Sequence, residues 1–355
     1  MQNFLEYPCP NCSAELNFDP IVKDLKCNHC NSVIPIEKKL ETIKEKDISG
    51  FLSTLVNPRK DIEIILYACS KCGKENEIKE NTPSFECINC GNNVVNSTAF
   101  QLQPINPSGL IPFSISKNEI QALFQNWVNK GFWTSDDFRK ISVLDNLRGI
   151  YVPFWTFDAQ TETQWSGQAG EYYYKTETYT DSEGNSKEEK VQHTRWHYRS
   201  GHYSKFFNDI LICGSDEISH SEVSKIFPFN LDELVPFDYK YLTGWESDTY
   251  SPEIKKCYDL SKSIINEKIY RECGNLCKID TYTDLSLVTA FENESYKHIL
   301  LPVWICTYVY KNKKYNFSIN GQNGKIDGNK PISSTKVGLV ILLVVVLLVA
   351  ILFLL

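Results

Sequence analysis

Eight of the thirteen cysteines in this 355-residue sequence form four Cys-x-x-Cys pairs, a spacing at which a tight turn presents two thiolates to one metal ion. Fourteen residues separate the first pair from the second, and fourteen again separate the third from the fourth. The two sets are Cys9, Cys12, Cys27 and Cys30, followed by Cys69, Cys72, Cys87 and Cys90. Four thiolates close a tetrahedral site, so we expect two structural Zn²⁺ ions, with iron in a rubredoxin-like site as the less common alternative.

The second cysteine set repeats the first at a constant offset of sixty residues. Other positions recur at the same offset: Tyr7 and Tyr67, Glu15 and Glu75, Leu25 and Phe85, Ile34 and Val94. The repeat predicts two zinc-ribbon modules, residues 1–36 and 66–96, joined by a charged linker over residues 37–65. A module this small buries too little apolar surface to fold alone, so metal binding must supply folding free energy.

Residues beside the cysteine pairs have structural explanations. Gly73 and Gly91 follow their pairs, where the backbone often needs a positive φ, and Asn31 takes that place after the second pair. His29 lies inside a pair, but four thiolates already complete the ligand set. We therefore interpret His29 as a surface residue.

The sequence ends in nineteen apolar residues, Val337–Leu355. As a helix they would reach roughly 28 Å, close to the bilayer's hydrocarbon thickness of about 30 Å. Lys325, Lys330 and Lys336 precede this span, and positive residues favour the cytoplasmic side. We expect a single-pass tail anchor in the cell membrane, inserted after translation, with the N-terminal body in the cytoplasm. The total of thirteen cysteines is odd, and the first residues contain no secretory signal. Both observations agree with a reducing compartment.

Between the second ribbon and the anchor, residues 97–330 predict an α+β body rich in strands. A capping box at Ser116–Glu119 begins an amphipathic helix that continues through Val128. A shorter helix is expected over 136–144, and a third starts at Ser251-Pro252-Glu253 and stops near Gly274. Tyr- and Thr-rich runs over 171–199 flank a polar tip at 181–185 and predict a long hairpin.

The body contains a sequence motif that occurs twice. Val152-Pro153-Phe154-Trp155 leads to Gly167-Gln168-Ala169-Gly170, and Leu301-Pro302-Val303-Trp304 leads to Gly321-Gln322-Asn323-Gly324. We interpret this as a duplicated β-hairpin unit, in which Pro-x-Trp enters a strand and Gly-Gln-x-Gly closes the turn. Tryptophans packed in a core explain the pattern better than a binding groove.

Other candidate chemistry is not supported by spacing. His193 and His197 would share one strand face but lie roughly 13 Å apart, so one ion cannot join them, and His202 is no nearer. Cys273 and Cys277 are four residues apart, which is not the usual redox spacing. The stretch 321–325 (GQNGK) lacks the full phosphate-loop pattern, and no common hydrolase or metalloprotease motif is present. We expect no enzyme activity and no small-molecule substrate.

Several stretches together resemble a group of bacterial zinc-ribbon membrane proteins. The tandem ribbons, LDNLRGIYVPFWTFDAQ over 144–160, LPVWICTYVYKNKKYNFSINGQNGKIDGNKP over 301–331 and the apolar end carry this resemblance. Such proteins are often called TFIIB-type zinc ribbon-containing or primosomal-helicase-like, although this chain has no ATP-binding loop. The resemblance implies a membrane adaptor, because similar proteins tend to be encoded beside SPFH-domain or envelope-stress proteins.

Two functions follow as hypotheses. The first is a non-enzymatic, tail-anchored adaptor or scaffold that binds a cytoplasmic or membrane-associated protein. The alternative is a membrane-tethered nucleic-acid binder, since ribbons and exposed aromatics can stack bases. The net charge of −7 disfavours the alternative, because no segment has the basic excess needed to neutralise phosphates.

Overall fold

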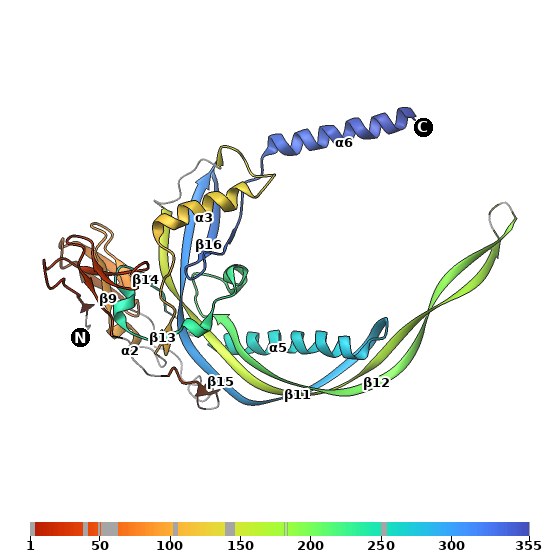
Figure 1. Ribbon diagram of the computed structural model, residues 1–355, viewed down its shortest axis with the longest axis horizontal. Helices are drawn as coiled ribbons and strands as arrows, with labels where there is room; N and C mark the ends of the chain where they lie inside the picture. The colour runs from red at the N-terminus through yellow and green to blue at the C-terminus, as the bar shows by residue number, and fades with distance from the viewer. Residues whose placement is uncertain are drawn as a thin grey trace.

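Two long antiparallel strands, β11 (Leu147–Thr180) and β15 (Thr281–Tyr310), form the spine of the computed structural model (Figure 1). A third long strand, β12 (Ser186–Cys213), pairs with the other edge of β11. The three strands bend into an arch, and β11 and β12 continue beyond β15 as a two-stranded arm (Figure 1). The structure describes residues 4–37, 42–48, 50, 63–101, 106–138, 146–180, 182, 184–249 and 254–354.

The long strands belong to a twelve-stranded sheet within the described part of the chain. Its shorter members are β1 (Phe4–Leu5), β5 (Lys46–Asp47), β8 (Ser84–Glu86), β9 (Asn93–Asn96), β10 (Gly109–Leu110), β13 (Val235–Pro236), β14 (Glu246–Ser247), β16 (Lys313–Asn320) and β17 (Ile326–Gly328). Separate small sheets contain β2 (Leu16–Asp19), β3 (Asp24–Cys27) and β4 (Val33–Ile34), and β6 (Ile64–Ala68) with β7 (Glu75–Lys79). The described α-helices are α2 (Thr98–Gln101), α3 (Lys117–Asn129), α4 (His220–Val223), α5 (Ile254–Cys277) and α6 (Ser334–Leu354). The prediction of an α+β, β-rich body with several helices is therefore confirmed as a mixed, β-rich body, in which the described helices are few.

Helix α5 lies along the inner, concave face of the arch (Figure 1). Its buried Ile265 and Ile269 join one hydrophobic cluster with Trp165 and Ala169 of β11. The helix continues past the predicted end at Gly274, where an added Cβ would lie 2.5 Å from the Tyr282 ring. Its predicted start at residues 251–253 lies outside the described residues.

Helix α3 forms as its capping box predicts. The Glu119 carboxylate accepts hydrogen bonds from the Ser116 amide at 2.8 Å and the Ser116 hydroxyl at 2.7 Å. Ile120, Phe124 and Val128 are fully buried on the face that packs against the body. The expected helix over 136–144 falls mostly outside the described residues.

The predicted duplicated hairpin is wrong in its first copy. Residues 167–170 form no turn but continue β11, which reverses only beyond Thr180. Glycine serves close packing here: a Cβ on Gly170 would lie 2.5–2.9 Å from side-chain atoms of Thr281, Thr194 and Trp196. Only the second copy, residues 321–324, is a turn, which joins β16 to β17.

The two Pro-x-Trp segments instead lie next to each other on paired strands, on opposite sides of the Val152–Leu301 pair. In the antiparallel register of β11 and β15, Val152 faces Leu301 and Tyr151 faces Pro302. Trp155 and Trp304 are both buried, as expected for core residues. The repeated motif therefore lies where the two longest strands, β11 and β15, pair with each other.

The two segments predicted to be zinc ribbons, called the first and second ribbon below, are built into the body. Strand β1 pairs with β9 of the second ribbon, and β8 pairs with β14, which continues into the main sheet through β11. From the first ribbon, the Phe18 amide donates to the Thr243 carbonyl at 2.9 Å, and the Phe18 carbonyl accepts from Trp245 Nε1 at 3.1 Å. The Trp245 ring stacks on Phe113 at 3.8 Å between centroids. One tryptophan thus joins the first ribbon to the body's core.

Helix α6 extends away from the body at the C-terminal end (Figure 1). Its 21 residues span about 31 Å at 1.5 Å per residue. It is long and apolar enough to cross a membrane, and none of its apolar span is buried against the body. The helix begins at Ser334, three residues before the span expected from the sequence, and Leu355 lies outside the described residues.

Replacement of Trp245 should destabilise the whole protein. We expect Trp245→Ala to lower the free energy of unfolding by about 3–5 kcal/mol, because it removes a buried ring shared by ribbon and body. Denaturant unfolding of the detergent-solubilised chain measures this change. Trp196→Ala, at the start of the arm, is the control and should lower it by clearly less, because the Trp196 ring is 46% exposed and packs on Gly170 at one side only. Equal effects of the two substitutions would contradict the shared core.

Candidate metal centres

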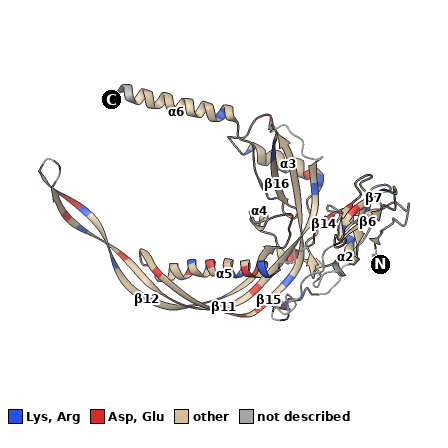
Figure 2. Ribbon diagram, turned by 180° about the vertical axis from the view of Figure 1, so that it is seen from behind, with Lys and Arg blue, Asp and Glu red and all other residues tan. Residues whose placement is uncertain are grey.

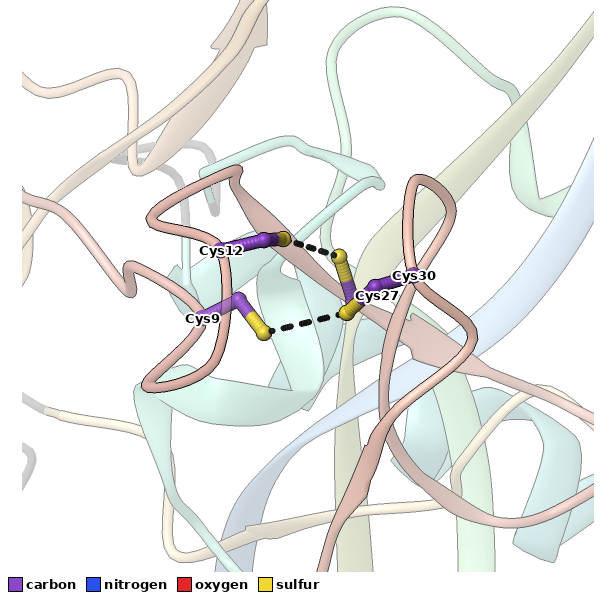
Figure 3. A group of neighbouring side chains, drawn as sticks. All are labelled: Cys9, Cys12, Cys27 and Cys30. Atoms are coloured by element: carbon purple, nitrogen blue, oxygen red, sulfur yellow. Dashed lines mark hydrogen bonds between the residues drawn. The ribbon is translucent and has the colours of Figure 1, made fainter.

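All four cysteine pairs adopt the same turn. In each, the amide four residues after the first cysteine donates to that cysteine's carbonyl, at 2.8–2.9 Å. The donating residues are Ser13, Asn31, Gly73 and Gly91, and each has a positive φ between 58° and 70°. The sequence indicated the last three of these positions; Ser13 carries no such signal because serine rarely adopts this conformation. In the first set, this turn places both sulfur atoms of one pair on the side that faces the other pair (Figure 3).

The turns bring the cysteines of each set together. In the first set, Sγ atoms of Cys9 and Cys30 lie 3.6 Å apart and those of Cys12 and Cys27 lie 3.5 Å apart (Figure 3). In the second set, Cys69–Cys90 is 3.8 Å and Cys72–Cys87 is 3.7 Å. All ligand atoms within a set lie within 4.8 Å of one another.

These distances fit metal ligation. Disulfide sulfurs would be about 2.05 Å apart, and all eight cysteines are free. A tetrahedron with metal–sulfur bonds of about 2.3 Å has edges of about 3.8 Å. Each set could therefore hold one ion with all four sulfurs, which leaves no position for a substrate.

Local hydrogen bonds favour thiolates, the form that binds metal. The Ser32 hydroxyl, with the Ser32 amide, lowers the pKa of Cys30 to about 6. Amide groups of Cys90 and Asn89 lower the pKa of Cys87 to about 6. In each set one cysteine is thus favoured as the thiolate, whereas desolvation and hydrogen bonds to the other cysteines raise the pKa of Cys12 and of Cys90 to about 12.

The two centres differ in their surroundings. Cys9 and Cys27 belong to the same hydrophobic cluster as Trp245 and Trp304. Cys69 and Cys87 lie in a smaller cluster with Tyr67. The first centre is therefore continuous with the main hydrophobic core. The second packs in its own cluster and is joined to the body by β8–β14 pairing and by hydrogen bonds from Ser84 and Asn93 to the Trp245 carbonyl, at 2.6 and 3.0 Å.

The histidines do not join either centre. His29 is exposed and belongs to neither cysteine cluster. His193, His197 and His202 each contact a different glutamate across the β11–β12 pair. These pairs are His193–Glu177 at 2.8 Å, His197–Glu171 at 3.2 Å and His202–Glu162 at 2.9 Å. Their separation along the hairpin agrees with the predicted role as polar strand residues.

The remaining candidate cysteines lie in the core. Cys273 and Cys277 are buried beneath the arch in the cluster that α5 shares with β11, and both thiols are free. Burial raises the pKa of each thiol, which makes it a poorer nucleophile. Packing is thus a sufficient account of both.

A charged cluster that sequence analysis did not identify lies where the arch bends. Asp158 sits at a β-bulge in β11, and its carboxylate accepts from the Asp209 amide at 2.5 Å and the Ser295 hydroxyl at 3.2 Å. Lys297 Nζ lies 2.8 Å from Asp209 and 3.2 Å from Glu45. Burial is the main cause that raises the pKa of Asp158 to about 6. These residues come from four separate segments, so no local pattern could reveal them.

Comparison with known proteins gives one informative match. A Bacillus subtilis (strain 168) protein named "Uncharacterized protein YdjG" is 26% identical over 337 residues, which cover 94% of this chain and 92% of that protein. No protein-family model matches the chain, and no solved structure matches it. The chain is thus similar along nearly its whole length to a protein whose printed name assigns no activity.

Loss of one buried ligand should remove one metal ion. We expect Cys27→Ser to reduce bound metal from two ions per chain to one and to lower the free energy of unfolding by more than about 4 kcal/mol. Elemental analysis and denaturant unfolding of the full chain measure both. His29→Ala, in the same turn, should change neither. Retention of two ions by Cys27→Ser would contradict the ligand assignment.

The bend of the arch should make stability depend on pH. The pKa of Asp158 is higher in the folded chain than its usual value near 3.9, so the folded state favours the protonated form. Its stabilising contribution is complete below about pH 4 and is lost as the pH rises through about 6, a change of up to about 3 kcal/mol. Asp158→Asn should remove this dependence, whereas the exposed Asp216→Asn should not. The unfolding free energy of wild type relative to Asp158→Asn should therefore fall between pH 5 and 7, and a difference that stays constant over this range would refute the assignment.

Proposed function

We propose that this protein is a non-enzymatic, tail-anchored membrane adaptor that binds a protein partner in the cytoplasm. The observation that carries the proposal is an aromatic stripe on the outer face of the arch. Two zinc ions would stabilise the ribbon segments, and α6 would hold the body at the membrane. The end-to-end resemblance to zinc-ribbon membrane proteins supports the same role.

The stripe follows from strand register. Residues directly opposite in an antiparallel pair point to the same face, and Ala169 and Trp165 point toward α5. The alternate positions therefore point outward. They carry a set of exposed large side chains: Tyr172, Tyr174, Trp196, Tyr198, Phe206 and Val288. We call these six residues the outer stripe.

The composition around the outer stripe suits protein recognition. The outward positions between its members are mainly small or neutral polar, such as Ser166, Gln168, Thr194 and Ser200. Tyrosine and tryptophan beside serine, threonine and amide side chains are typical of adaptable protein-binding surfaces. An isolated two-stranded β-hairpin such as the arm is only marginally stable, so a partner bound along this face would also stabilise the arm.

The same face argues against nucleic acid as the partner. Exposed aromatic side chains could stack on bases, which is the basis of the alternative function as a nucleic-acid binder. However, the outward positions of β11 from Gln160 to Tyr174 and of β12 from Gln192 to Phe206 include no lysine or arginine. Phosphate neutralisation needs such residues.

Topology also supports a cytoplasmic partner. Exposed Lys311, Lys313 and Lys314 lie on the β15–β16 hairpin, whose end lies near the start of α6 (Figure 1). Lys330 and Lys336 precede or begin α6 itself. Positive residues beside a membrane span favour the cytoplasmic side, so the ribbons, arch and arm would face the cytoplasm.

Site-specific photocrosslinking from native membranes tests the proposal. A photoreactive phenylalanine analogue at Tyr198 or Tyr174 should trap one and the same protein, while an analogue at Tyr270, an exposed tyrosine on α5, should not. Tyr174→Ser with Tyr198→Ser should weaken binding of that protein by about 30-fold, as expected for central aromatic contacts. Tyr270→Ser is the control and should leave binding unchanged.

Two outcomes would decide against the adaptor. Absence of any reproducible adduct from the outer stripe would remove its main support. Tight, salt-sensitive binding of DNA or RNA by the purified full chain, lost in the double tyrosine variant, would establish the alternative instead.

A further inference from the structure

Three segments meet where α6 leaves the body. The Ser333 amide donates to the Trp133 carbonyl at 2.8 Å, and Thr134 forms a β-bridge with Ile332. The hydroxyls of Ser135 and Tyr310 lie 2.9 Å apart, which ties the loop after α3 to the β15–β16 hairpin. The loop, the hairpin end and the stem before α6 therefore form one continuous edge.

This edge exposes large apolar side chains. Phe132, Trp133 and Ile332 are 66%, 44% and 69% exposed, and the two aromatic rings pack edge to face at 5.2 Å. A lipid headgroup layer suits such side chains, and tryptophan is enriched there because one end of its ring is apolar and the other polar.

The same edge carries positive charge. Lys311, Lys313 and Lys336 line a cleft of about 600 Å³ together with Asp136 and Asp137. Lys336 Nζ is held by Asp136 at 2.8 Å and by the Thr134 carbonyl at 2.9 Å. Lys311 and Lys313 are exposed and form no salt bridge with any residue that the structure describes. They remain able to bind an external anion.

We propose that Phe132, Trp133, Lys311, Lys313 and Ile332, here named the collar, lie in the headgroup layer of the bilayer that α6 crosses. The aromatic and aliphatic side chains enter the interface, and the two lysines bind phosphate groups of anionic lipids. This inference rests on the membrane anchor of the proposed function. It adds a second membrane contact besides α6, and this contact would fix the orientation of the body relative to the bilayer.

The charge of the arm agrees with this placement. The arm carries Glu177, Lys187 and Lys190, and Figure 2 shows basic and acidic residues along its two strands. Charged side chains are costly in hydrocarbon, so the arm would remain outside the bilayer. The collar instead lies directly beside the start of α6, through the contacts of Ser333 and Lys336 with the loop after α3.

Tryptophan quenching in liposomes tests the collar. The purified full chain is reconstituted into phosphatidylcholine vesicles containing about 30% phosphatidylglycerol, with bromine-labelled lipids as quenchers. Trp133→Tyr should remove more than half of the quenched fluorescence. Trp196→Tyr is the matched control, because Trp196 is 46% exposed but lies on β12 where the arm begins, and it should leave the quenched fraction unchanged.

The lysines have their own test in the same vesicles. Each lysine near an anionic surface contributes about a fivefold preference, so Lys311→Gln with Lys313→Gln should lower the ratio of docked to undocked Trp133 about 25-fold. The control is Lys187→Gln with Lys190→Gln on the arm, which should have no effect. Vesicles without phosphatidylglycerol should reproduce the effect of the collar substitutions in the otherwise unchanged protein.

The outcomes separate the collar from the adaptor. Alkaline extraction first shows whether α6 is inserted. Inserted protein whose quenching does not depend on Trp133 overturns the collar and leaves the adaptor untouched, because the assay contains no protein partner. Quenching by Trp133 without dependence on Lys311 and Lys313 overturns the anionic-lipid contact. Failure of α6 to insert overturns both the anchor and the collar.

Discussion

The structure depends on the contact between the first cysteine cluster and the core of the body. Cys9 and Cys27 share a hydrophobic cluster with Trp245, whose indole donates to Phe18 of the ribbon and stacks on Phe113. A four-thiolate metal site is strong only if its turns hold the sulfurs in place, and here the body helps to hold them. Metal binding would therefore be coupled to folding of the arch, and the ribbons need not be binding modules in their own right.

This coupling gives each part of the molecule one task. The segments with the cysteine clusters pack against one end of the β11–β15 spine, α5 covers the inner face of the spine, and the outer face is the proposed partner surface. The collar lies at a different edge, beside α6. The proposed partner surface and the proposed membrane contact are thus separate, so one protein could use both at once.

Local patterns predicted local structure well. Cysteine spacing predicted both clusters, the Ser116–Glu119 capping box predicted α3, and the apolar run predicted α6. The patterns failed where long-range packing decides. The Gly167–Gly170 stretch reads as a turn, yet its glycines let Thr281 and Trp196 approach a continuous strand. Likewise, the pairing of β1 with β9 and of β8 with β14 joins segments far apart in the chain, which no short motif records.

Hydrogen–deuterium exchange before and after metal removal tests the coupling most directly. The full chain in detergent is compared with the same protein after treatment with a chelator. Coupling predicts faster exchange in the ribbons and also at 241–247 and in the first half of β11, because these segments share the core of the first centre. Faster exchange confined to residues 1–36 and 66–96 would contradict it and would show that the ribbons are independent modules.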